Sequence, residues 1–189
     1  LSRRQRQMCI RDRIARDKNV NFLFEASVGG GIPIIRPLQT SLAPDEIDEI
    51  SGILNGTTNF ILTEMTENGS DFDSVLKDAQ AKGYAEADPT ADVEGYDACR
   101  KIAILTSLAY GKQLDFEDIY TEGITKITDR DIKYAAKLKA KVKIFGSSKL
   151  AGDKVSAMVA PKLITHDHPL YSVDGVFTVS YTHLTLPTT

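Results

Sequence analysis

The chain has 189 residues, of which 42% are hydrophobic and 26% are charged. These fractions are typical of globular proteins and exclude collagen-like, disordered and disulfide-framework classes. The sequence contains no run of 18 apolar residues and no charged-then-apolar N-terminal stretch. We therefore expect neither a membrane-spanning segment nor a secretory signal.

The two ends differ in composition from the middle. Residues 1–13 hold five arginines and one acid, whereas residues 179–189 hold no Lys, Arg, Asp or Glu. Both ends resemble translated adapter sequence, so we expect two non-native tails around a domain of residues 14–178. The alternatives for the first segment are a disordered tail and a basic arm for nucleic acid. Since residues 14–178 carry 18 basic and 25 acidic side chains, no nucleic-acid partner is expected.

Cysteine usage favours a reducing compartment. Cys9 and Cys99 are too few and too far apart to suggest a disulfide framework, so a cytoplasmic location is expected. Cys99 falls on a predicted helix with no partner histidine, and we interpret it as a small packing residue.

The first half of the chain predicts two helices and one or two strands. A short strand is expected over 20–24, followed by a glycine-rich turn and a helix with Pro33 in its first turn. Residues 47–54 have helical spacing, but a strand that ends in the turn at Asn55-Gly56 fits as well. A helix over 59–68 is expected to be capped by Thr57 and Thr58.

The second half adds three helices and a hairpin. Ser70 and Asp73 predict a capping box for a helix that Gly83 ends. An acid-rich loop, 84–94, then leads into a helix that runs to Tyr110. A helix opened by Thr128-x-x-Asp131 has Ile132, Ala135 and Ala136 on its inner face, and the strands expected over 141–146 and 155–160 form a hairpin. Helices and strands without strict alternation predict an α+β fold, a mixed sheet covered by helices.

The acid-rich loop is the densest candidate for chemistry. Five carboxylates fall in the twelve residues from Glu86 to Asp97, and Asp97 and Lys101 share one helix face. A solvated loop with acids at a helix start would explain the composition. In a cleft, however, such a lysine can donate a proton to a carbonyl while acids hold an ammonium.

Three other features leave alternatives open. The Gly56-Thr57-Thr58 turn would either cap a helix or bind an anion, and with the acids it would suit an amino-acid zwitterion. The glycine-rich stretch 28–31 lacks a dinucleotide fingerprint and would either expose carbonyls to a cation or turn the chain. His166 and His168 are expected in a surface loop rather than at a metal.

Residues 79–101 resemble the signature of the homoserine dehydrogenase family. Residues 24–35 and 52–60 are similar to two further blocks of that family, and the resemblance covers about residues 14–178. The signature positions that match are Ala79, Gly83, Tyr84, Ala85, Asp88, Pro89, Asp92, Val93, Gly95, Asp97 and Lys101.

The resemblance implies an oxidoreductase of threonine and methionine biosynthesis. It would reduce L-aspartate 4-semialdehyde to L-homoserine with NADPH or NADH, and it would be a homodimer. Lys101 would be the catalytic proton donor. The implied substrate-binding residues are Gly56, Thr57, Tyr84, Glu86, Asp92 and Asp97, and the backbone carbonyls implied to hold a sodium-type cation are those of Glu25, Val28, Gly30 and Ile32.

Two parts of the family pattern have no counterpart in this sequence. The family has an N-terminal dinucleotide-binding domain and an upstream Asn-Lys segment, and its chain returns to that domain after residues 174–177. We therefore expect a substrate and dimerisation domain that does not turn over alone, with the cofactor site mostly outside it. The alternatives are a non-catalytic amino-acid-binding module or relic of the family, and a nucleic-acid-associated protein that uses the arginine arm.

Overall fold

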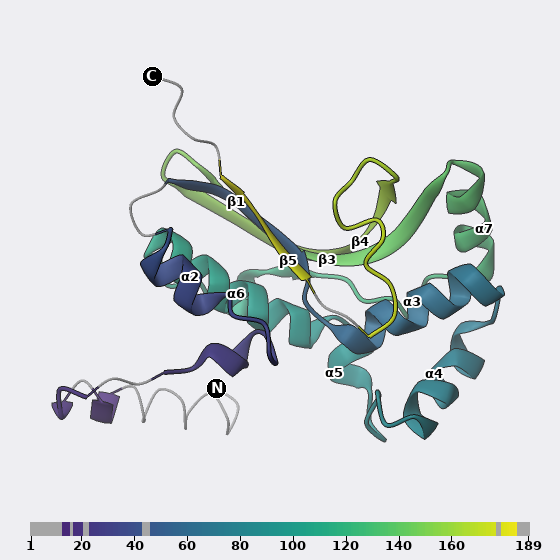
Figure 1. The fold of residues 1–189 in the computed structure, drawn as a ribbon, viewed down its shortest axis with the longest axis horizontal. Coiled ribbons are helices and arrows are strands. Elements are labelled where there is room, and N and C mark those ends of the chain that lie inside the picture. Colours follow the sequence, from purple (N-terminus) through teal and green to yellow (C-terminus); the bar gives the residue numbers. More distant parts are fainter. Residues whose placement is uncertain (1–12, 16, 21–22, 43–45, 177–178, 185–189) are drawn as a thin grey trace.

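A mixed sheet of five strands organises the chain, in the order β2-β4-β3-β1-β5 (Figure 1). The computed structural model describes residues 13–15, 17–20, 23–42, 46–176 and the backbone of 179–184. β2 pairs parallel to β4, and the other neighbours are antiparallel, which confirms the α+β class. The strands are β1 (Ile47–Ile53), β2 (Tyr120–Thr121), β3 (Ala140–Ala151), β4 (Lys154–Thr165) and β5 (Val179–Leu184).

Most of the helices gather on one face of this sheet (Figure 1). They are η1 (Glu25–Ser27), α2 (Ile35–Thr40), α3 (Gly56–Asn68), α4 (Phe72–Ala81), α5 (Thr90–Val93), α6 (Tyr96–Tyr110), η2 (Phe116–Asp118) and α7 (Asp129–Lys137). The main core lies between helices and sheet, with Ile102 and Leu105 of α6 fully buried. α6 approaches β3 closely at Gly146, because a Cβ there would lie 3.3 Å from Ile102 Cβ of α6, and it would also lie 2.7 Å from Cδ1 of Leu54, the residue that follows β1.

A smaller core lies apart from the main one. It consists of Ile53, Phe145, Ile164 and Leu170, and the segment that follows β4 closes it. His168 belongs to that segment, where its ring packs edge-on against Phe145 at 5.5 Å. The part of the chain that the structure describes holds no group of three His, Cys, Asp or Glu side chains that could bind a metal. It also holds no helix long and apolar enough to cross a membrane.

The predicted hairpin is confirmed and is longer than expected. β3 and β4 pair in continuous register from Ala140–Thr165 to Ala151–Lys154, so each strand has 12 residues. Gly152 forms the turn with a φ of +60°, a conformation that suits glycine. The extension follows from pairing on both sides, because residues 146–149 of β3 also pair with β1.

The N-terminal elements differ from prediction. Val20, Leu23 and Phe24 are not in a strand, and residues 21–22 lie outside the described part. α2 begins at Ile35 rather than at Pro33, because the Glu25 carboxylate accepts hydrogen bonds from the N–H groups of residues 34–36, at 2.7 Å for Ile35 and 2.8 Å for residue 36. Desolvation raises the pKa of Glu25, but these bonds outweigh it and leave the pKa below its ordinary value.

Two helix starts are also corrected. Residues 47–53 form a strand, and α3 begins directly after it at Gly56, capped by Asn55, whose Oδ1 accepts from Thr58 N at 2.9 Å. Thr57 and Thr58 are therefore inside the helix. α4 is capped by Asp71 rather than by a box at residues 70–73, since Asp71 Oδ1 accepts from the N–H of residue 74 at 3.0 Å. In each case the side chain one or two positions away makes the better acceptor.

The later helices follow the prediction more closely. α6 lies between Gly95 and Gly111, both with positive φ, and α7 has the predicted capping box. Ala136 of α7 is exposed, although the pattern placed it inside with Ala135. Residues 1–12 lie outside the described part. Residues 179–184, expected to be tail, form β5 beside β1, and the origin of both ends stays a prediction.

Candidate active site

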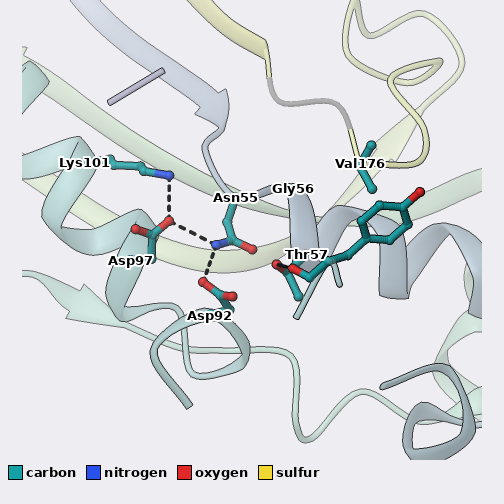
Figure 2. A pocket seen from close by; sticks show the side chains of 8 residues that line it. Asn55, Gly56, Thr57, Asp92, Asp97, Lys101 and Val176 are labelled. Atoms are coloured by element: carbon teal, nitrogen blue, oxygen red, sulfur yellow. Dashed lines mark hydrogen bonds and ion pairs between the residues drawn. The ribbon is translucent and has the colours of Figure 1, made fainter. Parts of the chain in front are cut away.

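The first turn of α3, residue 84 and the α5–α6 turn surround a cavity of about 340 Å³ (Figure 2). Six of the seven residues predicted to be catalytic or substrate-binding line it, although they come from three separate stretches of sequence. The structure thus brings these side chains together, while their roles stay predictions. The lining residues are Asn55, Gly56, Thr57, Tyr84, Asp92, Asp97, Lys101 and Val176.

Lys101 is anchored at the wall of the cavity and remains accessible. Its Nζ lies 2.7 Å from Asp97 Oδ2 and donates to the carbonyl oxygen of Leu54 at 2.9 Å. The i, i+4 spacing on α6 puts Lys101 and Asp97 on one face, as predicted. An ammonium has three N–H donors, and within the described residues Lys101 has these two partners. With 22% of its side chain exposed, it can direct the third donor at a ligand.

Asn55 was not among the predicted site residues, yet it organises the acids. Its Nδ2 donates to Asp92 Oδ1 at 2.7 Å and to Asp97 Oδ2 at 3.0 Å, as Figure 2 shows. Its Oδ1 is occupied by capping α3, where the N–H of Thr58 donates to it. The cap therefore fixes the amide so that its two N–H donors face the carboxylates. The strand-to-helix junction in the sequence signals the cap, but nothing local signals the two distant acids.

A close backbone approach holds the α5–α6 turn. The N–H of Ile124 donates to the carbonyl of Val93 at 2.8 Å. A Cβ on Gly123 would lie 2.1 Å from the same carbonyl oxygen, so only glycine fits there. Gly95 follows with a φ of +81° and turns the chain into α6. This packing fixes Asp92, just before the turn, relative to Asp97, just after it.

The other side of the cavity is formed by the start of α3. Thr57 Oγ1 donates to the carbonyl oxygen of Tyr84 at 2.8 Å, and the Tyr84 ring packs edge-on against Phe60 at 5.2 Å. The N–H groups of Gly56 and Thr57 belong to the first helical turn, where backbone donors lack partners within the helix. Such donors, at the positive end of the helix dipole, suit a carboxylate.

Glu86 is placed apart from the other predicted residues. Its side chain is exposed and does not line the cavity. Its carbonyl oxygen accepts from Gln80 Nε2 at 3.1 Å, which ties this part of the loop to α4. The predicted role of Glu86 in holding an ammonium therefore remains a prediction.

The glycine-rich loop forms a tight turn away from the cavity. None of Glu25, Val28, Gly30 and Ile32 lines the cavity. A Cβ on Gly29 would lie 2.7 Å from the carbonyl oxygen of Ile32, so the turn brings this oxygen against the loop's own backbone. The carbonyl oxygen of Glu25 accepts a long hydrogen bond from the N–H of Val28 at 3.4 Å.

Comparison with known proteins places this chain in one family. A family model described as homoserine dehydrogenase matches residues 33–185. Homoserine dehydrogenases of Neisseria gonorrhoeae and Bacillus subtilis are 51% identical over 163 residues and 46% identical over 169 residues. These matches cover 86% and 89% of this chain but 38% and 39% of the relatives. The chain thus spans about two fifths of the length of these curated relatives.

Solved structures agree with this result. A homoserine dehydrogenase from Thiobacillus denitrificans matches with a TM-score of 0.86 at 44% identity, over 90% of this chain and 39% of that one. A hyperthermophilic archaeal homoserine dehydrogenase in complex with NADPH matches with a TM-score of 0.76 at 29% identity, over 92% of this chain and 49% of that one.

Proposed function

This chain belongs to the homoserine dehydrogenase family, and we propose that it is the substrate-binding and proton-donating part of an NAD(P)-dependent oxidoreductase that reduces L-aspartate 4-semialdehyde to L-homoserine. The observation that carries the proposal is the arrangement of Lys101, Asp97 and Asn55 at the wall of an open polar cavity. Lys101 is held by two partners and keeps one donor for a ligand.

In this proposal Lys101 donates to the carbonyl oxygen of the aldehyde. Negative charge develops on that oxygen during reduction, and an ammonium within hydrogen-bond distance stabilises it and then transfers a proton to it. Asp97 keeps Lys101 oriented. Because the Lys101 side chain is partly exposed, solvent can return the proton.

The amino-acid end of the substrate has matching partners in the same cavity. Asp92 and Asp97 would hold the ammonium, and Asn55 keeps the two carboxylates close together by donating to both. The first-turn N–H groups of Gly56 and Thr57 would donate hydrogen bonds to the carboxylate, with Tyr84 beside them. A free amino acid carries these two opposite charges, so the cavity suits a zwitterion.

The cofactor is assigned to the rest of the protein. A bound nicotinamide would supply the hydride. The described residues contain no strand, glycine-rich turn and helix with dinucleotide-binding spacing, so we assign none of them to NADP or NAD. We propose that the 189-residue chain binds the amino acid without turning it over.

Two further proposals follow the family resemblance. One is a monovalent cation, such as Na⁺, on the carbonyl oxygens of Glu25, Val28, Gly30 and Ile32, in the tight turn at Gly29. The other is a homodimer. Equilibrium sedimentation of the chain, and its thermal stability in Na⁺ against a bulky organic cation, would test them separately.

The test of function uses two proteins. The 189-residue chain is titrated with L-homoserine by NMR, as wild type, Lys101→Met and the surface control Lys133→Met. The complete protein encoded by the extended reading frame is assayed for NADPH oxidation with L-aspartate 4-semialdehyde. We expect binding by the chain that K101M weakens and K133M does not, and turnover only by the complete protein, reduced about 10²- to 10⁴-fold by K101M.

Three outcomes would contradict parts of the proposal. Absence of binding by the chain together with absence of turnover by the complete protein would reject the assigned reaction. Full turnover by complete K101M would reject Lys101 as the donor. NADPH oxidation by the 189-residue chain alone would reject its inactivity and place a cofactor site within it.

A further inference from the structure

Unlike Lys101, another lysine of the chain is almost completely buried. Lys143, on β3, is 1% exposed. Its Nζ donates to Asp174 Oδ1 and to the carbonyl oxygen of Val173, both at 2.8 Å, and to Asn59 Oδ1 at 3.0 Å. Burial lowers the pKa of Lys143, and the ion pair with Asp174 opposes that shift.

The partners of Lys143 all act on one short segment, residues 173–175. Asn59 Nδ2 donates to the carbonyl oxygens of Val173 at 3.1 Å and Gly175 at 3.0 Å. The N–H of Gly175 donates to Thr63 Oγ1 at 3.1 Å. A second lysine from β3, Lys141, lies 2.7 Å from Asp174 Oδ2. We call Lys141, Lys143, Asn59 and Thr63, with the segment 173–175 that they hold, the Lys143 clamp.

The clamp and the cavity share a helix. Asn59 and Thr63 lie on α3, whose first turn forms one side of the cavity. Val176 directly follows the clamped segment and is the one aliphatic side chain among the described residues that line the cavity. Figure 2 shows it across the cavity from Lys101, beyond Thr57.

We propose that Val176 is a specificity-determining residue that contacts the methylene groups of the bound amino acid, and that Lys143 and Asp174 are positioning residues that hold it there. The inference rests on the proposed function. A substrate of four carbons with charges at its amino-acid end has an apolar middle, and the other described side chains that line the cavity are polar or aromatic.

The chemistry of the clamp supports positioning over simple stabilisation. A buried ion pair contributes little net stability compared with apolar side chains of similar size. Its hydrogen bonds, in contrast, have fixed directions, and here they hold the carbonyls of residues 173 and 175 and the N–H of residue 175. Such bonds fix the position of the backbone of residues 173–175, and therefore the position of Val176, the next residue.

The experiment measures how well the 189-residue chain distinguishes L-homoserine from L-serine, which has one methylene fewer. NMR titrations compare wild type, Val176→Ala, Lys143→Met, Asp174→Asn and the double variant K143M/V176A, with K133M as the surface-lysine control. D174N, which keeps the side-chain shape, covers the case in which K143M does not fold. Circular dichroism confirms that each variant used is folded.

We expect V176A to weaken homoserine binding about fivefold, from the lost contact with methylene groups, and serine binding less than twofold. K143M and D174N are expected to weaken homoserine binding by a similar factor. In the double variant, K143M should add nothing to V176A, because a positioning residue acts through the group that it positions.

The outcomes separate the two proposals. If wild type binds homoserine in a Lys101-dependent way but V176A binds it equally well, this inference fails and the proposed function stands. If K143M weakens binding as much in V176A as in wild type, the positioning role is rejected. If wild type binds neither amino acid, the proposal that the 189-residue chain binds the amino acid fails, and this inference fails with it.

Discussion

Among the described residues, two clusters each combine a lysine, an aspartate and an asparagine, one built on Asn55, which caps α3, and one on Asn59 of the same helix. In the cavity, Lys101 contacts Asp97, and Asn55 bridges Asp97 to Asp92. In the Lys143 clamp, the lysine contacts Asp174 and Asn59. The same three residue types thus occur in an open cluster and in a closed one.

The two lysines differ in whether an N–H donor of the ammonium remains available to a ligand. Lys101 has two partners within the described residues and 22% of its side chain exposed, so it can reach a ligand. Lys143 has at least three partners within 3.0 Å and is 1% exposed, so its donors are used inside the fold. Residue type alone therefore does not separate a lysine that can reach a ligand from one that is enclosed in the fold, whereas exposure and unused hydrogen-bonding capacity do.

The largest effect on stability is expected at the closed cluster. Lys143→Met leaves Asp174 with Lys141 as its remaining ion-pair partner and removes the donor to the Val173 carbonyl oxygen and to Asn59 Oδ1, so unfolding in urea should become easier by about 2–4 kcal/mol. Lys101→Met should cost less than about 1 kcal/mol, because that pair is partly exposed. Equal losses for the two variants would contradict the contrast between the clusters.

Asn55→Asp would disturb the open cluster next most. The new carboxylate can still cap α3, but it replaces an N–H donor by a third negative charge beside Asp92 and Asp97. We expect a loss of about 1–3 kcal/mol at pH 7 that shrinks as the pH falls and one carboxyl takes up a proton. Urea unfolding at several pH values measures this. Asn55→Ser, a capping residue without added charge, is the control and should show no such pH dependence.

Acid should weaken the closed cluster through Asp174. Burial raises the pKa of Asp174, but hydrogen bonds from Lys141 and Lys143 outweigh it and hold the pKa below the ordinary 3.8. A lowered folded-state pKa contributes stability above the unfolded value, which is lost as the pH falls through the folded one. D174N should therefore be less stable than wild type by about 1–2 kcal/mol at pH 7, and the gap should close in acid. A gap that is constant with pH would contradict this.

The smallest effect is expected at an exposed pair of the same composition. Lys133 and Asp129 of α7 lie 2.9 Å apart with 69% and 54% of their side chains exposed. Lys133→Met should change the free energy of unfolding by no more than about 0.5 kcal/mol, and added salt should remove even that. A loss comparable to that of K143M would mean that burial does not control these energies.

Local patterns in the sequence were sufficient for several elements. The capping box at Thr128 and Asp131, the end of α6 before Gly111, and the β3–β4 hairpin depend on side chains and backbone conformations within a few residues. Where neighbouring side chains compete to cap a helix, as at α3 and α4, the predicted cap lay one or more residues from the observed one. At α2, the capping carboxylate comes from Glu25, ten residues before Ile35, which no local window contains.

Six of the residues that line the cavity were predicted through the family resemblance, but Asn55 and Val176 were not, and neither was the arrangement of the site. The sequence by itself determined that acids and a lysine share one helix face, that a polar turn starts another helix, and that the class is α+β, because these follow from short spacings and from composition. Only the tertiary structure decided that Asn55 joins Asp92 to Asp97, that Glu86 stands apart, and that Lys143 holds the segment before Val176. Those contacts join residues 30 or more positions apart, and the packing of helices against the sheet decides which distant polar groups meet and which remain open to a ligand.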